Sequence, residues 1–186
     1  MKLIALSDTH LKTGEIPSQL QALIEEYDII VHTGDFSTVD AYEAFNATGK
    51  LKAVFGNDDV PELRKLLPER LKFEVEGVKI GLVHEGGLSV TNTTAQGYLA
   101  KEMEVDILIF GHLHRPLIEK TDVMLICPGS PTKPRMSEPS AVELIIETGS
   151  INGRILTLKG DTCDYIKFKE SLNKREQEEN MNEKKA

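Results

Sequence analysis

Two histidines, His112 and His114, follow directly on a short apolar run in this sequence. The run extends from Ile107 to Phe110 and is typical of a fully buried strand. Imidazole is the commonest neutral metal ligand, and one intervening residue lets two rings reach neighbouring coordination positions. Taken alone, the segment allows two interpretations: a metal site at the rim of a sheet, or an ordinary turn with two surface histidines.

Potential metal ligands also follow four other apolar runs of the chain. They are Asp8 and His10, Gly34-Asp35, Gly56-Asn57-Asp58-Asp59, and His84. Each has an ordinary explanation when taken singly, because Asp and Asn are common in turns and a half-buried histidine is usually hydrogen-bonded. Ligands bind beyond the carboxyl ends of parallel strands, where the loops converge. Four of the five histidines lie at such ends, which favours one common site.

The fifth histidine, His32, lies inside an expected strand, two residues before Gly34. We interpret it as a packed histidine or an outer-shell residue that is hydrogen-bonded to hold Asp35 or a neighbour.

The elements that must position these residues alternate in the first half of the chain. Apolar runs predict strands at residues 2–7, 28–33 and 51–55, and helical spacing predicts helices at 17–27, 39–47 and 61–67. This alternation predicts right-handed crossovers and a largely parallel sheet.

The pattern changes in the second half. A hairpin is expected at residues 71–75 and 78–83 around Glu76-Gly77, and a helix at 93–103, before the strand at 107–110. Strands at 117–119, 123–126, 141–147 and 154–158 follow without helices between them and are expected to be antiparallel. Two sheets packed face to face, with helices outside, are therefore expected rather than one doubly wound sheet.

Composition sets limits on the class of protein. The 186 residues carry a formal net charge of −8. The charged tail at 169–186 is neutral in sum, so the domain expected at 1–168 carries the negative charge, which disfavours nucleic acid as a partner. We expect the tail to be disordered or a frayed helix.

The chain shows no long apolar span and no secretory signal before the first expected strand. The only cysteines are Cys127 and Cys163, and nothing in their placement requires a disulfide. We therefore expect a cytoplasmic protein with reduced thiols and no membrane association.

Taken in order, the motifs Asp-x-His, Gly-Asp, Gly-Asn-x-Asp, His and Gly-His-x-His resemble those of the calcineurin-like metallophosphoesterase family. The segment from Pro128 to Arg135 is similar to a signature of its small bacterial and archaeal phosphodiesterases. The resemblance covers residues 1 to about 168. It implies an α/β (α+β) fold, a four-layer αββα sandwich of two mixed β-sheets flanked by helices.

The resemblance also implies a dinuclear metal centre. One metal would be bound by Asp8, His10 and His114, the other by Asn57, His84 and His112, with Asp35 bridging both. Members of the family commonly use Mn²⁺ or Ni²⁺, and the N/O donor set also suits Fe or Zn²⁺. Two such ions lower the pKa of a bridging water, which gives a hydroxide nucleophile, and they clamp the phosphoryl oxygens. The implied activity is hydrolysis of small phosphodiesters, nucleotide-type substrates among them.

Three acidic residues have less direct roles. Asp59 is expected to orient Asn57 or His84. Asp58 stands where many family members have a histidine that protonates the leaving oxygen or positions the phosphate. It is the weakest catalytic candidate, because an ordinary Asp, with a pKa of about 3.9, is mostly ionised at neutral pH. Glu85 stands where a glycine is usual, and either lines the site or is a plain surface residue.

One alternative belongs to a different class. Some chains of this fold, such as the retromer subunit Vps29, are non-catalytic protein-binding scaffolds. Every expected ligand position is filled in this sequence, which favours the enzyme. Small members often form homodimers or homotetramers, so a homo-oligomer is also expected.

Overall fold

A computed structural model describes residues 1–85, 92–148, 150–160 and 166 of the chain. The described strands form two five-stranded sheets. In spatial order, the first sheet contains β10 (Ser150–Thr157), β9 (Ser140–Glu147), β1 (Lys2–Leu6), β2 (Ile29–His32) and β3 (Leu51–Ala53). The second contains β4 (Arg70–Val75), β5 (Val78–Val83), β6 (Ile107–Phe110), β8 (Met124–Pro128) and β7 (Pro116–Lys120).

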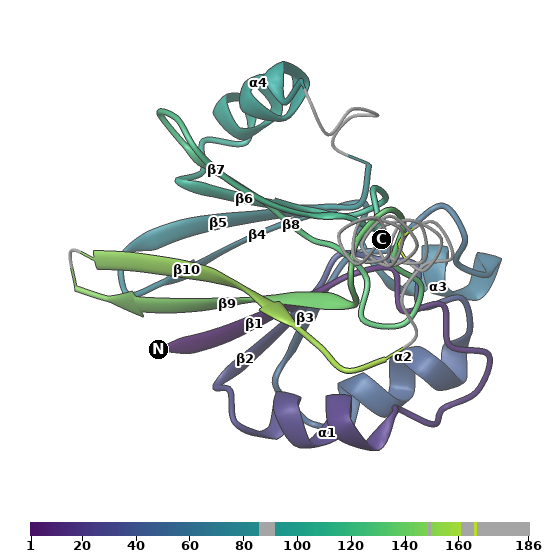
Figure 1. The fold of residues 1–186 in the computed structure, drawn as a ribbon. Coiled ribbons are helices and arrows are strands. Elements are labelled where there is room, and N and C mark those ends of the chain that lie inside the picture. Colours follow the sequence, from purple (N-terminus) through teal and green to yellow (C-terminus); the bar gives the residue numbers. More distant parts are fainter. Residues whose placement is uncertain (86–91, 149, 161–165, 167–186) are drawn as a thin grey trace, which may run out of the picture.

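Helices cover the outer faces of both sheets (Figure 1). The helices are α1 (Ser18–Glu25), α2 (Val39–Asn46), α3 (Pro61–Leu66) and α4 (Thr94–Glu102). Helices α1 and α2 lie against the first sheet, and α4 lies against the second. The expected αββα order of layers is confirmed.

Two strands at the centre of the sandwich explain why the chain folds this way. In β1, Leu3 and Ala5 pack between the sheets, whereas Ile4 and Leu6 pack under the helices of the first sheet. The same alternation in β6 places Ile107 and Ile109 between the sheets. Leu108 and Phe110 point the other way and pack against α4. Strands buried on both faces need continuous apolar runs, which is how they were recognised in the sequence.

The strands of the first half have the predicted directions. Strands β1, β2 and β3 are parallel, and β4 and β5 form the predicted antiparallel hairpin. Glu76 and Gly77 have φ values of 50° and 81°, so the hairpin turn has the left-handed backbone of a type I′ turn.

The antiparallel pairs expected in the second half are present as β7–β8 and β9–β10. On its other side, strand β8 runs parallel to β6, so the second sheet is mixed. The reason is that β7 takes the edge position of the sheet and reverses the chain, so that β8 returns beside β6 in the same direction. The direction of β8 therefore depends on the order of strands in the sheet, which the hydrophobic pattern does not encode.

Strand β10 begins at Ser150, earlier than the expected residue 154. It is an edge strand with mostly exposed residues, so pairing with β9 rather than burial defines it. The predicted boundary at 168 and the charged tail lie outside the described residues. Within the described ranges, no helix combines the length and apolarity needed to cross a membrane.

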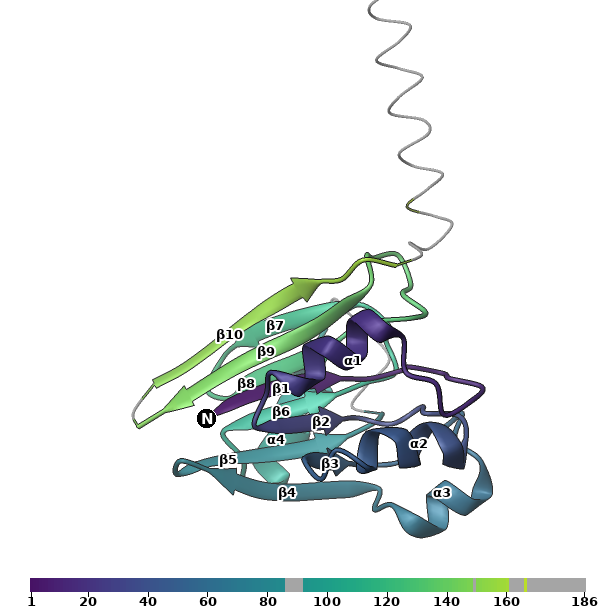
Figure 2. The same cartoon turned by 90° about the horizontal axis from the view of Figure 1, so that it is seen from below.

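The strands that precede the potential ligands end at one edge of the sandwich. Figure 2 shows this arrangement from below, with the two sheets overlapping and α2 and α3 at the edge where β1, β2 and β3 end. Loops from both sheets therefore meet at this edge.

Candidate metal centre

A first group of ligand atoms comes from the ends of β1, β2 and β6. Asp8, His10, Asp35 and His114 each offer one atom, and these atoms all lie within 4.8 Å of one another. His114 Nε2 lies 3.2 Å from Asp8 Oδ1 and 3.3 Å from His10 Nε2. Asp35 Oδ2 lies 3.6 Å from His10 Nε2.

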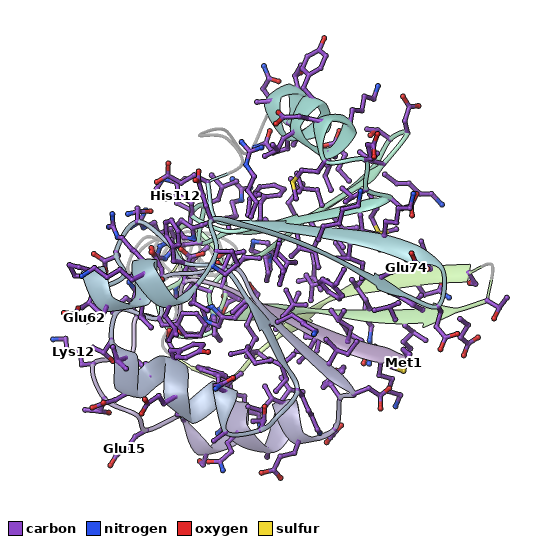
Figure 3. All side chains as sticks on the ribbon, turned by 180° about the vertical axis from the view of Figure 1, so that it is seen from behind. Met1, Lys12, Glu15, Glu62, Glu74 and His112 are labelled. Carbon is purple, nitrogen blue, oxygen red and sulfur yellow. The ribbon has the colours of Figure 1, made fainter. Side chains whose placement is uncertain are left out.

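A second group adjoins the first. Asn57 Oδ1 lies 2.9 Å from His84 Nε2 and 2.8 Å from His112 Nδ1. His84 Nε2 also lies 3.4 Å from Asp35 Oδ2, so this carboxylate oxygen lies between the two groups. In Figure 3, His112 lies at the same end of the molecule as Glu62, far from the end where Met1 and Glu74 lie. The structure thus brings together all seven residues that the sequence suggested as metal ligands.

The backbone turns sharply at most of these residues. Five of them have positive φ values, between 44° and 71°: Asp8, His10, Asp35, His112 and His114. The left-handed conformation costs an L-residue about 1–2 kcal/mol, and Asp, Asn and His adopt it more readily than most. Clustered backbone strain of this kind is typical of functional sites, because it turns side chains toward a common point.

Two histidines donate from Nδ1 to main-chain carbonyl groups and so turn Nε2 toward the site. His84 Nδ1 lies 2.6 Å from the carbonyl oxygen of Thr33, and His114 Nδ1 lies 2.6 Å from that of Lys133. A carbonyl oxygen can only accept, so Nδ1 of each ring donates the hydrogen. In the neutral ring, Nε2 then presents a lone pair to the site, as a metal ligand does. The two carbonyl partners have no signature in the sequence, because any residue supplies them.

The turn after β3 organises the loop around Asp35. The Asp59 carboxylate accepts backbone N–H groups from Gly56 at 2.7 Å, Ser37 at 2.8 Å and Asp35 at 3.1 Å. The expectation that Asp59 orients Asn57 or His84 is replaced by this role in the backbone. Gly56 has no room for a side chain, since a Cβ there would lie 2.2 Å from Asp35 Oδ1.

Asp58 lies beside the first group, away from the Asn57 amide. Its N–H donates to Asp35 Oδ1 at 2.7 Å, and its Oδ2 lies 2.9 Å from His10 Nδ1. Glu85 is exposed and lines a cavity of about 200 Å³ together with Asn57, His84 and Arg64.

His32 lies outside both groups. Its Nε2 lies 3.0 Å from Thr9 Oγ1, and its ring stacks on Phe36 at 3.7 Å between centroids. Burial lowers the pKa of His32 to about 3, which keeps the ring neutral. It therefore contacts the residue between Asp8 and His10 and makes no hydrogen bond to Asp35.

The segment from Pro128 to Arg135 supports the site from behind. Ser130 Oγ donates to the carbonyl oxygen of Asp8 at 2.7 Å, and Thr132 Oγ1 donates to that of Thr9 at 2.5 Å. The segment also supplies the Lys133 carbonyl that orients His114. This signature therefore contributes to the loop geometry of the first group.

The electrostatics of the carboxylates differ. Asp8 is fully buried, and burial raises its pKa to about 6 against the opposing charge of His84. Burial acts on Asp35 in the same sense, but the hydrogen bond and charge of His84 and the N–H of Asp58 outweigh it and lower the pKa. The same pairing raises the pKa of His84, although its burial opposes this. Burial lowers the pKa of His114 to about 4.

The donor set fits a bound cation. Asp8 Oδ1 is buried and has no hydrogen-bond partner among the described residues. His114 Nε2 faces both this oxygen and His10 Nε2 with a lone pair rather than a hydrogen. Lone pairs that converge without a proton between them repel, and a cation bound by all of them removes the repulsion. Imidazole, carboxylate and amide donors without thiolate suit divalent transition metals.

Comparison with known proteins agrees with this geometry. Residues 1–149 match the calcineurin-like phosphoesterase superfamily domain. A probable metallophosphoesterase of Methanothermobacter thermautotrophicus is 31% identical over 172 residues, covering 91% of this chain and 99% of that protein. A phosphodiesterase of Methanocaldococcus jannaschii is 24% identical over 143 residues, covering 69% and 83%. The crystal structure of Chaetomium thermophilum Vps29 shares the fold, with a TM-score of 0.69, 18% identity and coverage of 84% and 95%.

Proposed function

This chain belongs to the calcineurin-like phosphoesterase superfamily, and from that premise we propose that it is a metal-dependent phosphodiesterase. Its substrates would be small phosphodiesters, nucleotide-type diesters included, hydrolysed at a centre of two divalent transition-metal ions. The observation that carries the proposal is the pair of adjoining donor groups that share Asp35 Oδ2.

Each donor group supports one ion. Asp8, His10 and His114 would hold the first, and Asn57, His84 and His112 the second, with the Asp35 carboxylate between them. We propose Mn²⁺ or Ni²⁺, with Fe or Zn²⁺ also compatible with these donors. When bound, two such ions activate a water molecule for attack and withdraw negative charge from the phosphoryl oxygens.

The residues of the chain prepare this chemistry before any substrate arrives. The Thr33 and Lys133 carbonyls accept hydrogen bonds from Nδ1 of His84 and His114. Nε2 of each ring therefore already faces the site and needs no rearrangement of the ring to bind metal. Burial of Asp8 excludes water from one side of the centre. The cavity lined by Asn57, His84 and Arg64 adjoins the second group and gives room for one of the two ester groups.

The test is metal reconstitution. Protein stripped with a chelator and reloaded with Mn²⁺ or Ni²⁺ is expected to hydrolyse bis(p-nitrophenyl) phosphate in preference to p-nitrophenyl phosphate. Asp35→Ala and His114→Ala should each abolish turnover while the fold remains, as judged by circular dichroism. Asp122→Asn, at a carboxylate that is 85% exposed, should behave like the unmodified protein.

A second candidate function is a non-catalytic scaffold like Vps29. The fold similarity to Chaetomium thermophilum Vps29 supports it, and the complete set of donor residues favours the enzyme. Full metal occupancy without turnover on any phosphate mono- or diester, together with a stable partner, would reverse this order. A homodimer or homotetramer located in the cytoplasm remains a prediction, which light scattering and fractionation of cells would check.

A further inference from the structure

Asp58 contacts the metal centre from the outside, and its contacts differ from those of a proton donor. We propose that Asp58 is a positioning residue: it fixes His10 with hydrogen on Nδ1 and so directs the Nε2 lone pair of His10 at the first metal. The inference rests on the proposed function in that it concerns the same centre.

The distances support this assignment. Asp58 Oδ2 lies 2.9 Å from His10 Nδ1, and Ser37 Oγ lies 3.2 Å from the same nitrogen. Ser37 Oγ also donates to Asp58 Oδ2 at 3.3 Å. An ionised carboxylate only accepts, so the His10 ring donates from Nδ1 to the nearer oxygen and the serine hydroxyl donates to it as well. His10 Nε2, 3.3 Å from His114 Nε2, then carries a lone pair.

His10 differs from the other two oriented histidines in the nature of its partner. His84 and His114 each donate to a neutral carbonyl oxygen, whereas His10 donates to a carboxylate. A carboxylate that accepts from Nδ1 fixes the tautomer and also makes Nε2 a stronger donor to metal. The first metal would therefore be held more tightly than its three ligands alone provide.

The backbone of Asp58 explains why the side chain is so well placed. Its N–H donates to Asp35 Oδ1 at 2.7 Å, which anchors the residue to the carboxylate between the two groups. One residue thereby orients two ligand candidates, Asp35 through the main chain and His10 through the side chain. A substitution at Asp58 changes only the second contact, because every amino acid except proline keeps the N–H.

The exposure of the pair makes the proposal testable. The Asp58 side chain is 60% exposed, whereas that of His10 is 7% exposed. Side-chain hydrogen bonds of an exposed residue contribute little to folding, so variants at Asp58 are expected to fold. In this role Asp58 acts as an ionised carboxylate, which has no proton to give a leaving group, so substrates with good leaving groups should be preferred.

The experiment compares Asp58→Ala, Asp58→Asn and the control Glu62→Gln, which removes one exposed negative charge on α3. Nitrogen-15 NMR of histidine-labelled, metal-free protein at pH 8 reports which nitrogen of His10 carries hydrogen. Calorimetric titration with Mn²⁺ reports the dissociation constants of both sites.

In the unmodified protein, His10 should have hydrogen on Nδ1. Asp58→Ala should shift this tautomer toward Nε2–H and weaken one Mn²⁺ site by about 10–100-fold, leaving the other site unchanged. Asp58→Asn should lose less, because its amide oxygen still accepts a hydrogen bond. Glu62→Gln should match the unmodified protein in both measurements.

Two outcomes would overturn the proposal: an unchanged His10 tautomer in Asp58→Ala, or equal weakening of Mn²⁺ binding by Asp58→Ala and Glu62→Gln. Failure of the proposed function is distinguishable, since it would appear as absent metal binding or turnover in the unmodified protein. The tautomer measurement on metal-free protein tests the positioning role in that case too.

Discussion

Replacement of Asp8 by Asn should make the metal-free protein more stable at neutral pH. The Asp8 side chain is fully buried and its Oδ2 accepts the His112 N–H at 3.0 Å, while its Oδ1 has no hydrogen-bond partner within the described part of the chain. An Asn side chain has nearly the same shape and tolerates the φ of 54° found here. Its oxygen can keep the first contact, and its NH₂ group can donate to His114 Nε2, which lies 3.2 Å from Oδ1.

The expected magnitude follows from the pKa of Asp8, which is raised from 3.8 to about 6. Below pH 3.8 the carboxyl is protonated in both the folded and the unfolded chain, so ionisation costs nothing. Between pH 3.8 and 6 the unfolded chain loses the proton first, and the unmodified protein loses stability as pH rises. Each tenfold difference in proton affinity is worth 1.36 kcal/mol, so above pH 6 the loss reaches about 3 kcal/mol. The Asn side chain stays neutral at every pH, so the variant does not lose this stability.

The assay is urea unfolding of both proteins in the presence of a chelator, from pH 3.5 to 8. The free energy of unfolding of Asp8→Asn should exceed that of the unmodified protein by about 3 kcal/mol above pH 6, and the difference should shrink toward pH 4. Excess Mn²⁺ should stabilise the unmodified protein more than the variant, because metal binds the folded chain through the carboxylate. Asp122→Asn is the control and should show no such difference. A pH-independent difference, or a less stable variant throughout, would refute the reasoning.

Three further predictions concern buried and loop residues. Gly56→Ala should abolish Mn²⁺ binding in calorimetry, since its Cβ would lie 2.2 Å from Asp35 Oδ1. The control Gly97→Ala has open space at the Cβ, so it should bind Mn²⁺ normally, and its free energy of unfolding should rise by about 1 kcal/mol because alanine favours the helix α4. Asp59→Ala should lower the free energy of unfolding by at least about 3 kcal/mol, because it leaves three N–H groups without their acceptor; an effect below 1 kcal/mol in urea unfolding would contradict this. Cys127 is fully buried and its thiol pKa is raised to about 12 by burial, so mass spectrometry should find it unmodified by iodoacetamide at pH 8 until denaturant is added.

Much of the fold could be predicted from the sequence because its strongest signals are local. The apolar run from Ile107 to Phe110 alternates between two buried faces, and no other element satisfies such a run as well as a central strand. The position of ligand residues at strand ends was predictable for the same reason, since parallel strands deliver their carboxyl ends to one edge. The burial of a strand and the position of ligand residues at its end can both be inferred from residues that are adjacent in the sequence.

Tertiary structure alone decided how the site residues divide their tasks. Sequence spacing could not show that the Asp58 carboxylate meets His10, 48 residues away, or that Asp59 binds main-chain N–H groups rather than Asn57. The tautomers of His84 and His114 depend on carbonyl groups, which every residue possesses. The direction of β8 depends on which strand takes the sheet edge. Hydrophobic pattern and motif order therefore determine which residues converge, while long-range contacts between side chain and main chain determine what each of them does there.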